Sequence, residues 1–163
     1  MQSFLSSDIT DLLVGITPIY LNSFLQRELY GITATISDEH GETKVRLFNE
    51  ADVFGIALAW MLFESGLRTQ AIRGILNKLA GTKRTNAKKA AHVLLRSQAD
   101  YILVVREARK PKSKSTPETQ IITAEENEFA HVIEANPTAN ILIVPIGAKF
   151  ADIQKRINVL YGE

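Results

Sequence analysis

The stretch KVRLFNEADV, residues 44–53, changes its pattern in the middle. Its first half alternates polar and apolar residues, which is typical of a half-buried strand. Its second half has the composition of a helix start, with Asn49 as the N-cap and two acids near the positive end of the helix dipole. The residues that follow, VFGIALAWMLF (53–63), are apolar on nearly every helical face. We therefore expect a helix from about Asn49 to Ser65 at the buried centre of the fold.

Two helices are predicted before this stretch. SSDITDLL (6–13) offers Ser6 or Ser7 as an N-cap, and GITP (15–18) reads as a turn in which Thr17 caps a second helix. That helix should run from Pro18 to about Leu29 and bury Leu21, Phe24, Leu25 and Leu29. Its other face carries Ile19, Tyr20, Asn22, Ser23, Gln26 and Arg27.

A hairpin and a fourth helix complete the N-terminal half. ITATISDEHGETKVRLF (32–48) has two alternating segments around DEHGE, with Gly41 in the turn. Gly66 ends the central helix, and a further helix should bury Ile72, Ile75, Leu76 and Leu79. Two helices, a hairpin and a second helix pair indicate a winged helix-turn-helix.

The C-terminal half reads differently. A fifth helix is expected at 85–97, strands at 100–108 and 119–123, a helix from a Thr123 cap to Ala135, a strand at 140–146 and a last helix at 149–160. The nearly continuous apolar run NILIVPI predicts that the third strand is buried on both faces. The fold class is thus mainly α with β: a winged helix-turn-helix (1–80), a basic connecting helix (81–98) and a small α+β module (99–163).

Composition narrows the functional classes. The chain has no cysteine, which excludes disulfides, thiolate metal sites and cysteine nucleophiles. The N-terminus lacks the pattern of a signal peptide, and the longest apolar run (53–63) is shorter than the roughly 20 residues that span a bilayer. A cytoplasmic protein without a membrane partner is expected.

The formal net charge of +1 conceals an asymmetry. Residues 1–80 carry six Lys/Arg and nine Asp/Glu. Residues 81–115 carry ten Lys/Arg and two Asp/Glu, whereas residues 116–163 carry three Lys/Arg and seven Asp/Glu. The central basic block is either an electrostatic footprint for nucleic acid or a solvated helix face and linker.

Three motifs in order resemble the DNA-binding domain of the MerR family of transcription regulators. GITP (15–18) occupies the place of the family's turn G-V-S-P, and KVRLFNEADV is similar to its G-Y-R-x-Y-S-E-E-D-V. MLFESGLRTQAIRGIL (61–76) has the spacing of L-R-E-L-G-F-S-L-E-E-I-R-E-L-L. The resemblance covers roughly residues 5–80 and implies a homodimeric, sequence-specific regulator that binds double-stranded DNA.

The chain departs from this family pattern in several places. Ile19 stands where the family usually has Arg, Asn22-Ser23-Phe24 replaces an R-Y-Y-like run, and Arg68 replaces a capping Ser. The long coiled-coil helix of the family is missing. The C-terminal module is expected to hold the dimer together instead, through pairing of a strand such as Ile141–Ile146 with its copy. Alternatively, it binds a small-molecule effector between its sheet and its helices.

The resemblance and the residue types together predict the DNA contacts. Arg46, assisted by Lys44, would bind phosphate from the wing, and the helix start would do so through Thr17 and Tyr20. Ile19 would touch a thymine methyl, and base edges would be read by Asn22, Ser23, Gln26 and Arg27. Auxiliary cations are Lys83, Arg84, Lys88 and Lys89. The simpler interpretation is that each of these residues only lies on a solvent-exposed helix face.

Protein–protein interaction and catalysis are the two alternatives to DNA binding. A winged-helix module for protein–protein interaction fits the acidic N-terminal half and the predicted exposure of Ile19. Catalysis is not expected, because no P-loop, dinucleotide fingerprint, zincin motif or nucleophile elbow is present. His40, His92 and His131 are isolated, so neither a metal nor a cofactor is predicted.

Overall fold

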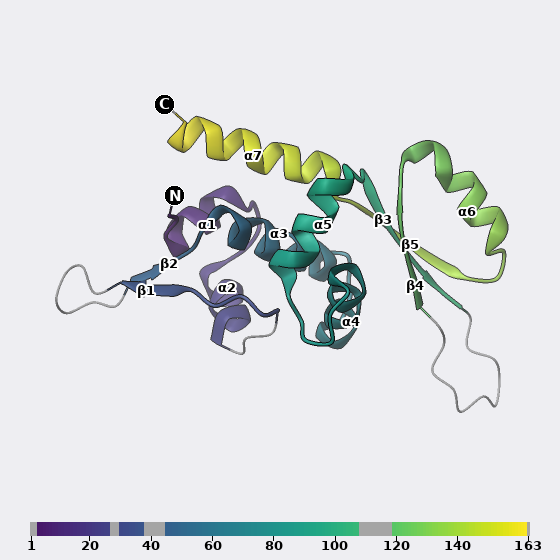
Figure 1. Ribbon diagram of the computed structural model, residues 1–163, viewed down its shortest axis with the longest axis horizontal. Coiled ribbons are helices and arrows are strands. Elements are labelled where there is room, and N and C mark those ends of the chain that lie inside the picture. The colour runs from purple at the N-terminus through teal and green to yellow at the C-terminus, as the bar shows by residue number, and fades with distance from the viewer. Residues whose placement is uncertain (1–2, 27–29, 38–44, 108–118, 163) are drawn as a thin grey trace.

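A computed structural model describes residues 3–26, 30–37, 45–107 and 119–162, and shows a mixture of helices and strands (Figure 1). The elements are α1 (Ser6–Leu12), α2 (Pro18–Gln26), β1 (Thr35–Ser37), β2 (Val45–Leu47), α3 (Glu50–Glu64), α4 (Thr69–Ala80), α5 (Ala87–Ser97), β3 (Tyr101–Arg106), β4 (Thr119–Ala124), the 3₁₀ turn η1 (Glu126–Glu128), α6 (Phe129–Ala135), β5 (Asn140–Pro145) and α7 (Gly147–Tyr161). The expected mixed α and β composition is confirmed.

Helix α3 forms the centre of the structure. Asn49 caps it as predicted: its Oδ1 accepts from the Asp52 N–H at 2.9 Å, and Asp52 Oδ2 accepts from the Asn49 N–H at 2.9 Å. Every residue from Asp52 to Leu62 is buried. A helix buried on all sides must be covered by several other elements, and α1, α2, α4, α5 and α7 all contribute to this core.

Helix α5 approaches α3 closely because the residues at the contact are small. A Cβ on Gly55 would lie 2.9 Å from the backbone nitrogen of Lys88, closer than real Cβ contacts come. On α5, Ala87, Ala90 and Ala91 are buried. Asn86 caps this helix by accepting from the Lys89 N–H at 2.9 Å, so α5 begins at Ala87, later than the predicted start at residue 85.

An ion pair lies at the edge of the same contact. Asp52 is only 3% exposed, and its Oδ1 lies 3.0 Å from Nζ of Lys88 on α5. Burying a carboxylate is costly unless a cation compensates it, so Lys88 stabilises the start of α3.

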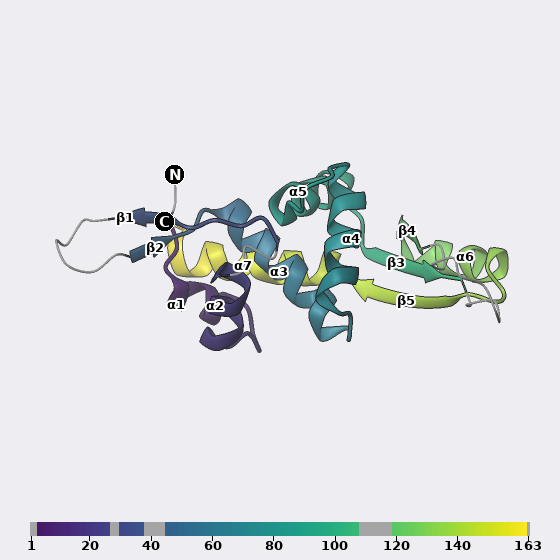
Figure 2. The ribbon, with the colours of Figure 1, turned by 90° about the horizontal axis from the view of Figure 1, so that it is seen from below.

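The second sheet has the order β4-β3-β5, with both neighbours antiparallel to β3 (Figure 2). The expectation that residues 140–146 (NILIVPI) form a strand buried on both faces is wrong. In β5 only Val144 is buried, whereas the four residues Ile102–Val105 of β3 are all buried. Position in the sheet explains this result, because β3 is paired on both sides and β5 is an edge strand.

Two predicted helix caps are also corrected. Thr123 does not cap a helix, because it lies in β4 opposite Ile102; one turn of 3₁₀ helix intervenes before α6 begins at Phe129. The residue before α1 is Leu5, not a serine, and its N–H donates to Asp8 Oδ2 at 2.7 Å. The Asp8 carboxylate therefore satisfies an N–H group at the start of α1.

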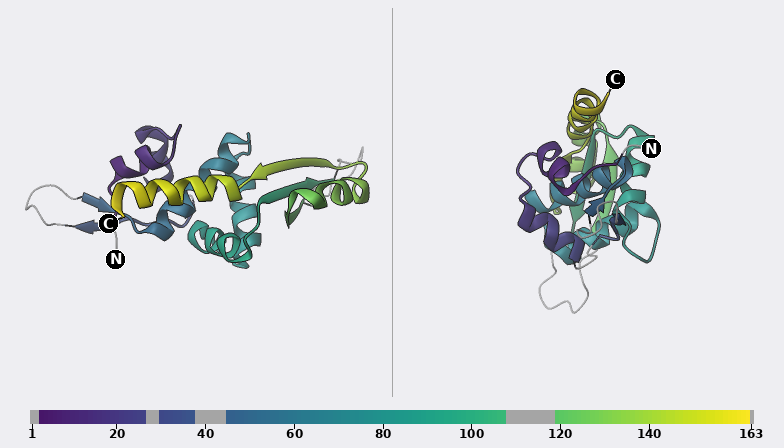
Figure 3. Two further views of the ribbon diagram at one scale, coloured as in Figure 1. Left: turned by 90° about the horizontal axis from the view of Figure 1, so that it is seen from above. Right: turned by 90° about the vertical axis from the view of Figure 1, so that its left-hand side faces the viewer.

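Helix α7 returns from the sheet and runs along the helical body (Figure 3). Phe150 packs edge-on against Phe54 of α3, with ring centroids 5.2 Å apart, and Tyr161 packs in the same way against Phe4 at 5.2 Å. Ile153 and Ile157 are buried between these two contacts. The C-terminal helix thus belongs to the same core as the N-terminal helices.

We expect two glycine-to-alanine substitutions to have opposite effects. Gly55→Ala should lower the free energy of unfolding by about 1–3 kcal/mol, because α3 and α5 must move apart. Gly74→Ala is the matched control: Gly74 also lies inside a helix, but no atom lies within 4 Å of its Cβ position. There the better helix propensity of Ala should raise stability by roughly 0.5–1 kcal/mol. Urea unfolding followed by circular dichroism measures both, and equal effects would contradict the tight contact.

The Lys88–Asp52 ion pair leads to a second prediction. Lys88→Ala should cost about 1–3 kcal/mol of stability, because the Asp52 carboxylate stays buried without its cation. Lys89→Ala, one residue further along α5 and exposed, should change stability by less than about 0.5 kcal/mol. Equal urea midpoints for the two variants would show that the pair does not stabilise the fold.

Candidate nucleic-acid interface

Helix α2 presents one polar face to solvent. The Thr17 hydroxyl accepts from the Tyr20 N–H at 3.4 Å, which confirms Thr17 as the cap. Leu21 and Phe24 are buried as predicted. Ile19 is 80% exposed, Asn22 and Gln26 are exposed, and Ser23 is half-buried. Ser23 is therefore less accessible than the other residues predicted to read bases.

Tyr20 is exposed but anchored. It is 43% exposed, and its ring lies 5.5 Å from Trp60 and 5.5 Å from Phe63, measured between centroids. Aromatic pairs at such distances fix the orientation of the ring. The start of α2 is held in this way against the second half of α3.

Arg46 on β2 joins the hairpin to α2. Its Nη1 donates to Oδ1 of Asn22 at 3.0 Å, across 24 positions of sequence. On the hairpin, Arg46 stands opposite Ile36 in the β1–β2 register. This hydrogen bond brings together Arg46 and Asn22, which the sequence predicts as two separate DNA contacts. The guanidinium keeps other N–H groups for a further acceptor, and the Asn22 amide keeps its NH₂ group.

Two of the predicted contact residues, Arg27 and Lys44, lie outside the described residues, as do His40 and Gly41 of the predicted turn.

The auxiliary basic residues divide into two kinds. Lys83 and Arg84 are exposed in the turn between α4 and α5, and Lys89 is exposed on α5. Lys88 instead pairs with Asp52, so that carboxylate already neutralises its charge. The ion pair could not be inferred from sequence spacing, because its partners lie in different helices.

The turn between α4 and α5 is fixed to the segment that follows α2. The Tyr30 carbonyl accepts from the Ala87 N–H at 2.9 Å, and the Thr85 carbonyl stands where a Cβ of Gly31 would be. The Asn77 amide of α4 donates to the Lys83 carbonyl at 3.2 Å, and within the turn the Thr82 hydroxyl donates to the Arg84 carbonyl at 2.8 Å. Lys83 and Arg84 are thus carried on an ordered turn.

Two tyrosines outside α2 have a shifted pKa. Burial raises the pKa of Tyr30, although Thr69 and Arg73 nearby act in the opposite direction. Burial also raises the pKa of Tyr161, and Asp8 and Asp11 of α1 add to this effect. A raised pKa keeps a phenol neutral, so neither residue contributes charge to the interface.

Within the described ranges, no group of three His, Asp or Glu side chains is placed to hold a metal ion. His92 and His131 are exposed on separate helices. No helix in the described part of the chain is long and apolar enough to cross a membrane.

No known protein family matches the chain, and a comparison with curated proteins finds no match either.

Proposed function

We propose that the protein is a sequence-specific, double-stranded DNA-binding regulator of MerR-like type that acts as a cytoplasmic homodimer. In this proposal, α1 and α2 form the helix-turn-helix and the β1–β2 hairpin is the wing. The observation that carries it is the Arg46–Asn22 hydrogen bond, which holds a cation of the hairpin beside the exposed face of α2.

The contacts follow from the chemistry of this face. Arg46 would bind a phosphate with the N–H groups that Asn22 leaves free, and Thr17 and Tyr20 would bind the backbone at the start of α2. Asn22 and Gln26 carry amides that suit adenine, and Ile19 suits a thymine methyl group. Arg27 and Lys44 retain the roles that the sequence predicts.

The acidic N-terminal half needs additional cations, because phosphate contacts dominate the affinity for DNA. Lys83 and Arg84 are the strongest candidates, since both are exposed and their turn is fixed to the segment after α2. Lys89 is exposed as well. Lys88 is the weakest of the four predicted auxiliary cations, because its ammonium is paired.

In this proposal, the interface of the homodimer lies on the β4-β3-β5 sheet. Strand β5 lies at the edge of the β4-β3-β5 sheet, so its outer backbone groups pair with no strand in the described part of the chain. Ile143 is exposed on it. An edge strand with apolar side chains is a template for pairing with a second copy. This arrangement supports dimerisation through residues 140–145.

A second candidate function is protein–protein interaction through the same helices. It is favoured by the 80% exposure of Ile19 on a half of the chain with a formal charge of −3. An exposed apolar side chain next to an anchored Tyr20 suits an apolar protein surface as well as DNA.

DNA binding is tested by titrating the full chain with genomic fragments at several salt concentrations. The logarithm of the binding constant should fall steeply with the logarithm of salt, and Arg46→Ala should reduce that slope by about one phosphate contact. Arg106→Ala, an exposed arginine at the far end of β3, is the control that should leave the slope unchanged. The absence of binding at low salt would overturn the proposal and favour the interaction module.

The dimer is tested by two matched substitutions in the C-terminal module. Ile143→Lys should shift the solution mass toward the monomer, because two charges would meet at the paired edges. Ile133→Lys changes another exposed isoleucine, which lies on α6 and not on β5, and should leave the dimer intact. Light scattering after gel filtration measures both, and a monomeric unmodified chain would refute the assignment.

A further inference from the structure

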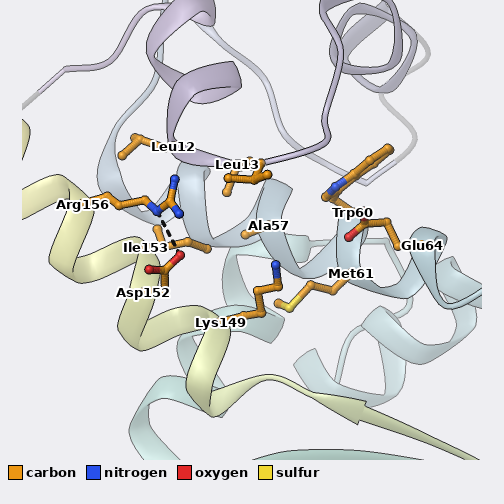
Figure 4. Close-up of a pocket in the computed structure, with 11 residues that line it drawn as sticks. Leu12, Leu13, Ala57, Trp60, Met61, Glu64, Lys149, Asp152, Ile153 and Arg156 are labelled. Atoms are coloured by element: carbon orange, nitrogen blue, oxygen red, sulfur yellow. Dashed lines mark hydrogen bonds and ion pairs between the residues drawn. The ribbon is translucent and has the colours of Figure 1, made fainter.

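A cavity of about 190 Å³ lies between α7, α3 and the residues that join α1 to α2 (Figure 4). Its apolar walls include Leu12, Leu13, Ala57, Met61 and Ile153. A cavity of about 150 Å³ in another protein holds one benzene ring, so this one has room for a ring with short substituents. The volume and the walls together suit a small, flat, apolar molecular body.

An unpartnered donor lies in the wall of this cavity. Trp60 is only 7% exposed, and its indole nitrogen is buried without a hydrogen-bond partner among the described residues. Figure 4 shows this nitrogen on the side of the ring that faces the other lining residues. A buried N–H without an acceptor is costly, so an acceptor supplied by a ligand would be bound favourably.

Figure 4 shows Arg156 and Asp152 on one side of the cavity and Trp60 and Glu64 on the other, with the ammonium of Lys149 between the two sides. On α7, Lys149 and Arg156 line it together with Asp152, which accepts from Arg156 Nε at 2.9 Å. Because Arg156 and Asp152 already neutralise each other, Lys149 supplies the positive charge that matches a single carboxylate. On α3, Glu64 lines the cavity near Trp60, and both lie next to Gly15. A ligand hydroxyl at this end could accept from the indole N–H and donate to Glu64.

We infer that this cavity is a binding site for a small aromatic monocarboxylate with a hydroxyl group at the end opposite its carboxylate. The carboxylate lies between Lys149 and Arg156, the ring packs against the apolar walls, and the hydroxyl pairs with Trp60 and Glu64. None of the residues that line the cavity belongs to α2, so this inference goes beyond DNA binding and does not rest on it.

Trp60 is the single tryptophan of the chain, so its fluorescence reports directly on occupancy of the cavity. Titration of the full chain with para-hydroxyphenylacetate should change the emission saturably, with a dissociation constant between about 10 µM and 1 mM. Para-hydroxyphenylacetamide, which has the same shape without the charge, should bind about five- to tenfold more weakly. Phenylacetate, which lacks the hydroxyl, should also bind more weakly.

The variants compare two lysines of one helix. Lys149→Gln should abolish the preference for the acid over the amide, whereas Lys155→Gln, which does not line this cavity, should keep it. Ala57→Leu should fill the cavity and prevent binding; if it does not fold, the two lysine variants decide the question. No saturable change with any probe, equal binding of acid and amide, or unchanged binding in Lys149→Gln would each overturn the inference.

Discussion

The structure depends on the burial of α3 on every side. One face is held closely against α5, where Gly55 leaves space for the backbone at Lys88. The second half of the helix contributes Trp60 and Phe63 to a cluster with Tyr20 of α2, and Phe54 contacts Phe150 of α7. Because all of these partners share one rigid helix, their relative positions are fixed by the packing around it.

Much of this architecture could be predicted from the sequence. The abrupt change at Asn49 marks both the end of β2 and the cap of α3, because strand alternation and capping chemistry are local properties. The order of elements in both halves was predicted for the same reason. Not every local prediction is correct, because the caps expected at Ser6 or Ser7 and at Thr123 do not form. The burial of residues 140–146 depends on distant partners: this stretch has the composition of a buried strand, yet its place at the sheet edge is decided by β3.

In the candidate interface, too, the sequence predicts local features but not contacts between different elements. The exposure of Ile19 and Gln26 follows from helical periodicity, and the cap at Thr17 from residue type. The Arg46–Asn22 hydrogen bond and the Lys88–Asp52 ion pair each join residues from different elements, so no spacing rule could reveal them. The cavity was also missed, because it is lined by α1, α3 and α7 together. Trp60 links the two regions, since it contacts Tyr20 and lines the cavity.

The return of α7 to α1 has a consequence for the kinetics of folding. Tyr161 packs on Phe4, so residues near the two ends of the sequence must meet before this part of the core is complete. Contacts between residues so far apart along the chain carry a large loop-closure entropy and slow the folding reaction. During synthesis, helices α1 and α3 leave the ribosome long before α7, and until α7 arrives Phe4 and Phe54 lack part of their apolar cover.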